Sequence, residues 1–180
     1  MINQEAQRCK CSHFKSVRIV LSDVLSDASF SSRWTQTNDA LEIEVASEEI
    51  EGHDLALEIL LCLGQALWES ASAEAREVYL RLLAAEIEAG VAGEIDEESL
   101  SEKRALFANR ASARSRIRLL YYARASFAST VAEYIHSLWH DVTVRTGEEH
   151  LPAQWLRRRL EFLARWFPPD RGHRLFPGRR

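Results

Sequence analysis

The chain places two histidines four residues apart, His136 and His140, within the stretch E-Y-I-H-S-L-W-H-D. Glu133 comes three residues before the first histidine. Side chains three and four residues apart share one face of a helix, so the two imidazoles and the carboxylate could approach a single ion. His53, at the start of an earlier predicted helix, is a candidate for a further ligand. We therefore treat this set as a candidate site for zinc or another divalent metal.

This pattern resembles that of the DinB-like metal-binding helical bundles, which combine one early histidine with a later His-x-x-x-His pair. The resemblance covers His53, His136 and His140 and no other part of the chain. It implies a bundle that holds a divalent ion and, if the protein is an enzyme, a hydrolase-type reaction on metal-activated water. In the structural alternative both histidines lie half exposed on a helix, with Glu133 and Asp141 as surface partners. Because histidine pairs at this spacing are common, we favour the structural alternative and expect no cofactor.

Two charged residues interrupt stripes of apolar side chains. Glu86 falls among the apolar residues of one predicted helix, and Arg124 falls among those of another. An unpaired charge in such a place costs several kcal/mol. We therefore predict that Glu86 and Arg124 form a buried or half-buried ion pair that sets the register of the two helices. Arginine suits this role because its planar guanidinium can bind a carboxylate through two hydrogen bonds.

The net charge of −4 conceals an uneven distribution along the chain. Residues 39–102 carry 18 acidic and two basic side chains, whereas residues 103–180 carry 16 basic and six acidic ones. A basic half can indicate nucleic-acid binding, but an acidic half repels a phosphate backbone. We therefore expect the two halves to neutralise each other, inside one fold or across a dimer.

A nucleic-acid-binding face is the alternative for the arginines of the basic half. Arginines beside aromatic rings suit the binding of single strands, and Trp155, Phe162 and Trp166 could supply the rings. The same aromatic residues fit the edge of a helical core equally well. No helix-turn-helix, zinc-finger or RNP signature accompanies them in the sequence. The candidate face consists of Arg110, Arg114, Arg118, Arg158 and Arg165.

Apolar residues that recur every three or four positions predict helices for most of the chain. One strand is predicted at 40–46, where Leu41, Ile43 and Val45 alternate with other residues, and its expected mate is the segment 142–144. In the alternative, this segment is the entry to a helix. The segment 29–39 is predicted to be a loop. The helices are expected at about 12–28, 53–70, 72–89, 96–109, 111–145 and 152–167.

Five or six helices with short connections predict an all-α fold, an antiparallel bundle with at most one short β-hairpin or extended segment. One domain is expected at 12–168, between a mobile N-terminal segment, 1–11, and a basic mobile tail, 169–180. The sequence has no apolar run of about 18 residues and no hydrophobic N-terminal leader. Its three cysteines do not indicate a disulfide framework. We therefore expect a cytoplasmic protein without a membrane association.

The motifs of several enzyme classes are missing from the sequence. It has no glycine-rich phosphate loop, no Gly-x-Ser-x-Gly elbow and no His-Glu-x-x-His helix. We therefore predict a non-enzymatic protein-interaction or regulatory module. It is expected to bind a protein partner or a second copy of itself through opposed acidic and basic surfaces.

Overall fold

The computed structural model describes the elements that make up most of the chain. Five helices and a three-stranded sheet occur in the order β1 (Ser16–Ser22), β2 (Ser32–Thr37), β3 (Ala40–Ala46), α1 (Gly52–Ser70), α2 (Ala73–Glu88), α3 (Glu97–Ala108), α4 (Ser115–His136) and α5 (Ala153–Trp166). The described residues are 14–23, 25, 31–46, 52–109, 114–140, 146–173 and 175–176.

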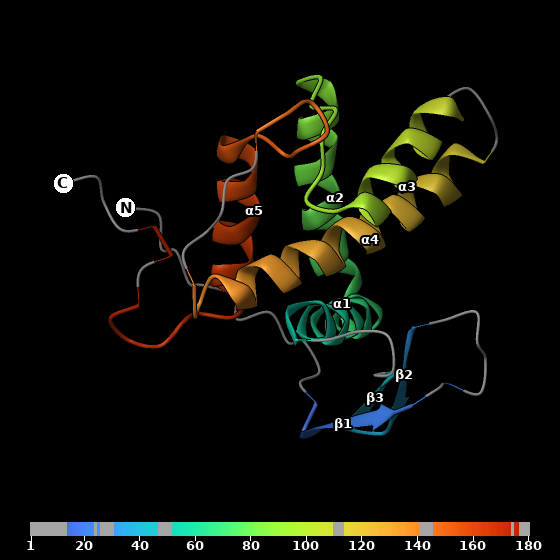
Figure 1. Cartoon of the computed structure of the whole chain (residues 1–180). Helices are drawn as coiled ribbons and strands as arrows, with labels where there is room; N and C mark the ends of the chain where they lie inside the picture. Colours follow the sequence, from blue (N-terminus) through green and yellow to red (C-terminus); the bar gives the residue numbers. More distant parts are fainter. Residues whose placement is uncertain are drawn as a thin grey trace.

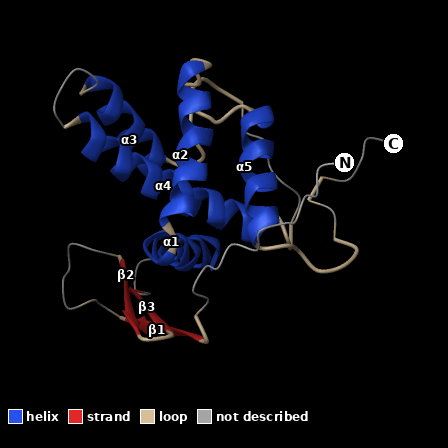
Figure 2. Cartoon of the chain, turned by 180° about the vertical axis from the view of Figure 1, so that it is seen from behind, coloured by secondary structure: helices blue, strands red, loops and turns tan. Residues whose placement is uncertain are grey.

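The elements form successive layers with α4 at the centre (Figure 1). The sheet packs on one side of α1, and α4 crosses the other side of α1. Helices α2 and α5 stand on the far side of α4, and α3 runs beside its N-terminal half. The view from behind shows the same separation of a sheet end and a helical end (Figure 2). The fold is therefore a mixture of helix and sheet in which helices dominate.

The prediction of an all-α bundle is wrong because the first predicted helix, 12–28, contains strand β1 instead. Val17 and Leu21 fit a helical spacing, but Val17, Ile19 and Leu21 also alternate as in a strand. Strand β1 pairs in parallel with β3, with Ile19 opposite Ile43. This pairing joins residues that are distant in the sequence, so the local pattern could not decide between the two structures.

Strand β2 lies where a loop was predicted, and it pairs antiparallel with β3 in a sheet of order β1-β3-β2. Trp34 is its only large apolar residue, so β2 has no alternating apolar pattern. The predicted strand 40–46 is confirmed as β3, and Leu41, Ile43 and Val45 are fully buried against α1. Its predicted mate, 142–144, lies outside the described residues, and β1 and β2 take that role.

Local signals placed most of the helix boundaries correctly. Ser72 caps α2, its side chain accepting a hydrogen bond from the backbone N–H of Ala75. Asp96 caps α3 in the same way through Ser99. The predicted helix 111–145 is too long, because α4 ends at His136. Tighter backbone bonds, such as Leu138 N–H to the Ile135 carbonyl at 3.0 Å, close the last turn there.

Helices α1 and α4 approach each other closely at Gly64. A Cβ atom on Gly64 would lie 2.6 Å from the Cα of Ala128 on α4. The neighbouring small residues of α4, Ala125 and Ser129, are also buried. Their small side chains allow α1 to cover this face of α4 while α2 and α5 cover the other.

Substitution Gly64→Ala is expected to lower the free energy of unfolding by about 1–3 kcal/mol, because the added methyl group must push two backbones apart. Chemical denaturation at neutral pH measures this effect. The two effects of alanine on stability have opposite signs, so the direction of the measured change decides between them. Alanine is the better helix former by about 1 kcal/mol, so a more stable variant would show that the helices do not meet at Gly64.

The ends of the described chain add two observations. The predicted N-terminal segment, 1–11, lies outside the described residues. In the tail, Leu175 and Phe176 pack against the main helical core, and the Arg157 guanidinium lies 4.6 Å from the centre of the Phe176 ring.

Taken singly, none of the described helices is long and apolar enough to cross a bilayer, and only α1 and α2 together, across a bend of 118°, meet that standard.

Candidate functional site

The most unusual feature of the interior is a cluster of four charged side chains among the helices. Glu86 on α2, Glu94 in the α2–α3 loop, Lys103 on α3 and Arg159 on α5 are each at most 1% exposed. Two carboxylates meet two cations, so the cluster is neutral as a whole. Charges in such a place are stable only when each has partners that replace water.

Arg159 lies at the centre of this charged cluster. Its Nε donates to Oε1 of Glu86 at 2.9 Å, and its Nη2 donates to the other oxygen of Glu86. The same guanidinium binds both oxygens of Glu94, at 2.7 Å and 2.8 Å. One planar guanidinium therefore holds two carboxylates from separate elements, which only arginine can do.

Lys103 and Tyr122 complete the surroundings of Glu94. The Lys103 ammonium donates to Oε1 of Glu94 at 3.0 Å and to the Gly93 carbonyl at 3.0 Å. The Tyr122 hydroxyl donates to the same Glu94 oxygen. Glu94 thus accepts hydrogen bonds from α3, α4 and α5 and ties these helices to the loop that carries it.

Burial and nearby charges shift the pKa values of Glu94 and of two buried tyrosines close to the cluster. Burial alone would raise the pKa of Glu94, but the positive charge and hydrogen bonds of Arg159, aided by Lys103 and Tyr122, outweigh it and bring the pKa to about 2. Burial raises the pKa of Tyr79 to about 12. The Tyr79 hydroxyl is hydrogen-bonded to the hydroxyls of Ser126 and Thr130. Burial likewise raises the pKa of Tyr122 well above its ordinary value. Glu94 is therefore a carboxylate, and both tyrosines are neutral, at physiological pH.

The backbone around Glu94 is held by the loop before α5. The Glu94 N–H donates to the Glu149 carbonyl, and the Leu151 N–H donates to the Glu94 carbonyl, both at 2.9 Å. The two loops approach so closely that a Cβ on Gly93 would lie 2.2 Å from the His150 carbonyl oxygen. These contacts set one wall of an adjacent cavity.

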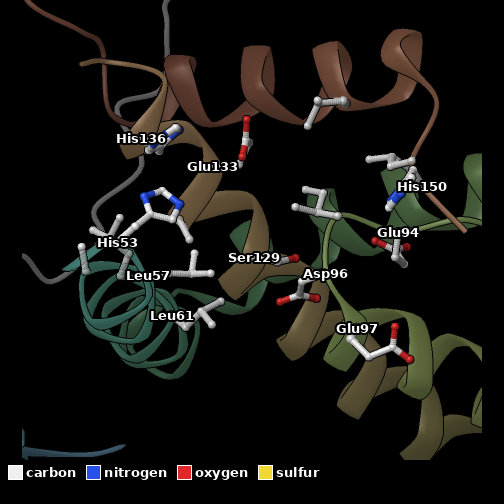
Figure 3. A pocket seen from close by; sticks show the side chains of 16 residues that line it. His53, Leu57, Leu61, Glu94, Asp96, Glu97, Ser129, Glu133, His136 and His150 are labelled. Carbon is white, nitrogen blue, oxygen red and sulfur yellow. The ribbon is translucent and has the colours of Figure 1, made fainter. Parts of the chain in front are cut away.

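A cavity of about 420 Å³ lies between α1, α4 and these two loops. Figure 3 shows His53 and His136 at one end of it and Glu94, Asp96 and His150 toward the other. Its lining consists of His53, Ala56, Leu57, Leu60, Leu61, Glu94, Ile95, Asp96, Glu97, Ser129, Ala132, Glu133, His136, His150, Leu151 and Leu156.

The structure brings the three histidines of the metal hypothesis close together. The ring centres of His53 and His136 are 5.4 Å apart, and those of His136 and His140 are 4.8 Å apart. The latter two rings stack at 29°, so their in-plane nitrogen lone pairs are not directed at one point. Within the described chain, no three His, Cys, Asp or Glu side chains form a group that could hold a metal ion. Glu133 lines the cavity beside His136.

The predicted ion pair between Glu86 and Arg124 is wrong, although Glu86 is fully buried and does pair with an arginine. Glu86 faces α5 and binds Arg159. Arg124 faces α1, where it donates to Gln65 at 3.1 Å and lies 3.6 Å from the Glu69 carboxylate. Because α4 is covered on opposite sides, its apolar pattern did not show which neighbour each residue would meet.

The described arginines of the candidate nucleic-acid face lie in two separate groups. Arg114 and Arg118 lie at the N-terminal end of α4, away from Arg158 and Arg165 on α5 (Figure 1). Arg110 lies outside the described residues. The aromatic residues proposed as stacking platforms belong to the core, and Phe162 and Trp166 contact each other with ring centres 4.4 Å apart. Arg158 stacks on Trp155 at 4.3 Å.

Sequence reasoning missed Arg159, Lys103 and Glu94. Arg159 falls in the apolar stripe of α5, which also contains Trp155, Leu156, Leu160 and Leu163. Lys103 similarly falls between Leu100 and Leu106. A search for charges inside apolar stripes would have found both cations, but Glu94 lies in a loop and has no periodic signal.

Ion pairs join the acidic part of the chain to its basic part within the fold. The Arg159 contacts with Glu86 and Glu94 are buried, and Arg118 with Glu102 and Arg124 with Glu69 are weaker examples near the surface. Internal pairing therefore accounts for part of the uneven charge distribution.

Comparison with protein-family models, with curated proteins and with solved structures gave no match.

Proposed function

We propose that the protein acts by binding another polypeptide through the outer edge of strand β1, and that this polypeptide is a second copy of the chain. One observation carries the proposal. Val17, Ile19 and Leu21 are 49%, 50% and 56% exposed, in an alternating row on one strand. An exposed apolar edge strand readily pairs with another strand.

These three side chains of β1 continue the buried face of the sheet past the area that α1 covers. Side chains of paired residues in neighbouring strands point to the same face, so Val17 and Ile19 lie on the same side as their partners Leu41 and Ile43. Those partners are fully buried, whereas the β1 residues are not. Within the described chain, no strand pairs with the outer edge of β1.

The sequence of β1 fits antiparallel pairing with an identical strand. Pairing centred on Ile19 places Val17 opposite Leu21 of the second copy and Arg18 opposite Val20. The same register places Lys15 opposite Asp23 at each end, so opposite charges meet and like charges do not. A two-fold axis gives both copies the same contacts, as in most homodimers.

The energies predict a weak dimer. Cross-strand apolar pairs contribute about 0.2–1 kcal/mol each, in addition to main-chain hydrogen bonds. Association costs at least about 4 kcal/mol in translational and rotational freedom. We therefore expect dimers that form and dissociate with concentration, as suits a regulatory contact in the cytoplasm.

Sedimentation velocity over a range of protein concentrations tests this function. The wild-type sedimentation coefficient should rise with concentration, and Ile19→Lys should stay monomeric because it places two ammonium groups opposite each other. The matched control is Val78→Lys, the same kind of change at a residue of α2 that is 41% exposed. It should associate like the wild type.

Salt distinguishes this contact from one between opposed acidic and basic surfaces. A dimer held by apolar and main-chain contacts should change little as salt is raised, whereas association through charged surfaces should weaken strongly. A monomer at every concentration, or association abolished by salt but not by Ile19→Lys, would contradict the proposed edge.

A further inference from the structure

Three large apolar residues on the N-terminal half of α4 face solvent. Ile117, Leu120 and Tyr121 are 54%, 46% and 52% exposed. Residues three and four positions apart lie on one face of a helix, so the three side chains form one strip, here called the α4 strip. This half of α4 and its neighbour α3 project from the rest of the fold (Figure 1). The α4 strip is therefore open to another molecule.

The α4 strip continues the face of α4 that α1 covers. Arg124 lies about two turns beyond Ile117 on the same face. Its guanidinium contacts Gln65 and Glu69 of α1. Helix α1 ends at Ser70, the residue after Glu69, so it does not extend over the α4 strip. One continuous face of α4 is thus covered by α1 at one end and bare at the other, and a further helix would complete it.

Arginines border the α4 strip on both sides. On a helical projection of about 100° per residue, Arg116 falls beside Leu120. Arg114 and Arg118 fall beside Tyr121 on the opposite side. These borders oppose pairing of the strip with that of a second copy, because arginine would meet arginine. They match a helix whose apolar stripe is flanked by aspartate and glutamate.

We propose that the α4 strip docks an amphipathic helix of another protein, with an apolar stripe between rows of acidic side chains. Ile117, Leu120 and Tyr121 are the anchors, at the spacing of i, i+3 and i+4 that helix-in-groove contacts use. The bordering arginines pair with the carboxylates of the incoming helix. This contact is separate from the β1 edge, so either proposal can fail without the other.

Two other anionic partners fit the α4 strip less well. Nucleic acids bind single strands through rings on which bases stack, and the aliphatic side chains of Ile117 and Leu120 offer none. A bilayer is bound by a helix with a long apolar face, whereas the strip holds three side chains before Arg124 ends it. The narrow strip suits the apolar stripe of a single helix.

A synthetic peptide of about 18 residues, long enough to form a helix by itself, is the probe. It has leucines at every third and fourth position and glutamates elsewhere. One control peptide replaces each glutamate with lysine, and the other has the same composition in scrambled order. Fluorescence anisotropy of the labelled peptides should show saturable binding of the acidic amphipathic peptide, at least about ten-fold tighter than of either control. Equal binding of either control, or no binding of the probe, would overturn the proposal.

An apolar variant locates the binding to the α4 strip. Leu120→Ser should weaken binding of the acidic amphipathic peptide at least about ten-fold, because few anchors carry most of the affinity of such contacts. The matched control is Val78→Ser on α2, where the side chain is 41% exposed. It should change the affinity less than about two-fold. Both variants should melt like the wild type in circular dichroism, and equal effects of the two on binding would place the peptide elsewhere.

A charge reversal tests the basic border. Arg116 is exposed, whereas Arg118 already lies 3.8 Å from Glu102. Arg116→Glu should weaken the acidic peptide about three- to ten-fold and tighten the lysine peptide. Arg81→Glu, the same change at an exposed residue of α2, should alter neither by more than about two-fold. Equal effects of the two reversals would mean that net charge, and not the border of the strip, attracts the peptide.

Competition identifies the class of partner. Unlabelled acidic peptide should displace the labelled one, whereas vesicles of phosphatidylserine and phosphatidylcholine, and an oligothymidine, should not. Displacement by the vesicles would assign the α4 strip to a lipid surface, and displacement by the oligothymidine would assign it to a nucleic acid. Either result would overturn the proposal.

Discussion

Replacing Arg159 with methionine is expected to lower the free energy of unfolding by about 3–5 kcal/mol at neutral pH. Arg159 is fully buried and makes four hydrogen bonds to the carboxylates of Glu86 and Glu94. Methionine fills much of the same volume, so the main effect is electrostatic. Two carboxylates remain in the interior, and Lys103 alone compensates one of them. Urea denaturation followed by circular dichroism measures the change.

The preceding residue supplies the control. Arg158→Met removes the same charge from the same helix, but Arg158 is exposed and stacks on Trp155. Exposed cation–π contacts contribute about 1 kcal/mol or less, so this variant should lose no more than that. Equal losses at 158 and 159 would contradict a special role for the buried cluster.

A double variant shows whether the loss arises from the carboxylate of Glu86, which Arg159→Met leaves without a cation. Adding Glu86→Gln to Arg159→Met removes the carboxylate that has lost its only cation. The double variant should therefore be more stable than the sum of the two single losses predicts. Strictly additive losses would mean that Glu86 and Arg159 do not interact.

The second large effect is acid destabilisation through Glu94. The pKa of its carboxyl falls from an ordinary value of 4.5 in the unfolded chain to about 2 in the fold. A lowered carboxyl pKa contributes stability above the unfolded value, and this contribution is lost as the pH falls through the folded value. Glu94 should therefore contribute about 3 kcal/mol near neutral pH, lost between about pH 4.5 and pH 2.

Comparison with Glu94→Gln isolates this group from the other carboxylates. Glutamine has the shape of protonated glutamate, so the variant should be several kcal/mol less stable than the wild type at pH 7. The difference should shrink as the pH falls toward 2, because Glu94 then becomes protonated in the fold as well as in the unfolded chain. Denaturation curves at several pH values measure it. A difference that stays constant with pH would show that Glu94 contributes through packing rather than charge.

The exposed residue Glu88 on α2 supplies a control for this second effect. Glu88→Gln removes a carboxylate without disturbing a buried partner. Such surface substitutions change stability by about 0.5 kcal/mol or less. A loss at pH 7 comparable to that of Glu94→Gln would mean that overall charge, and not the buried cluster, controls stability.

The elements that the sequence predicted well are those whose information is local. Helix α2 begins where Ser72 can cap it, and α3 begins where Asp96 can cap it. Strand β3 was recognised because three apolar residues alternate and all face one layer. Caps and short periods depend on residues within one or two turns of each other, so they can be read along the chain.

Strands β1 and β2 could not be predicted in the same way. Val17 and Leu21 fit both a helical and a strand period, and only the pairing of β1 with β3, about 24 residues later, separates the two. Strand β2 has almost no apolar pattern, and β3 provides the hydrogen-bonding partner that makes it a strand. Both depend on contacts between distant segments.

The candidate sites show the same division. Helical periodicity identified Glu86 as a charge within an apolar stripe that needs a partner, because it shows which face of a helix is buried. It could not determine that Arg159 is that partner, nor that Glu94 and Lys103 join them. It placed His53, His136 and Glu133 in one hypothesis, but the cavity that they line depends on how α1, α4 and two loops meet. Periodicity shows which side chains turn inward, and only tertiary packing decides what each of them faces.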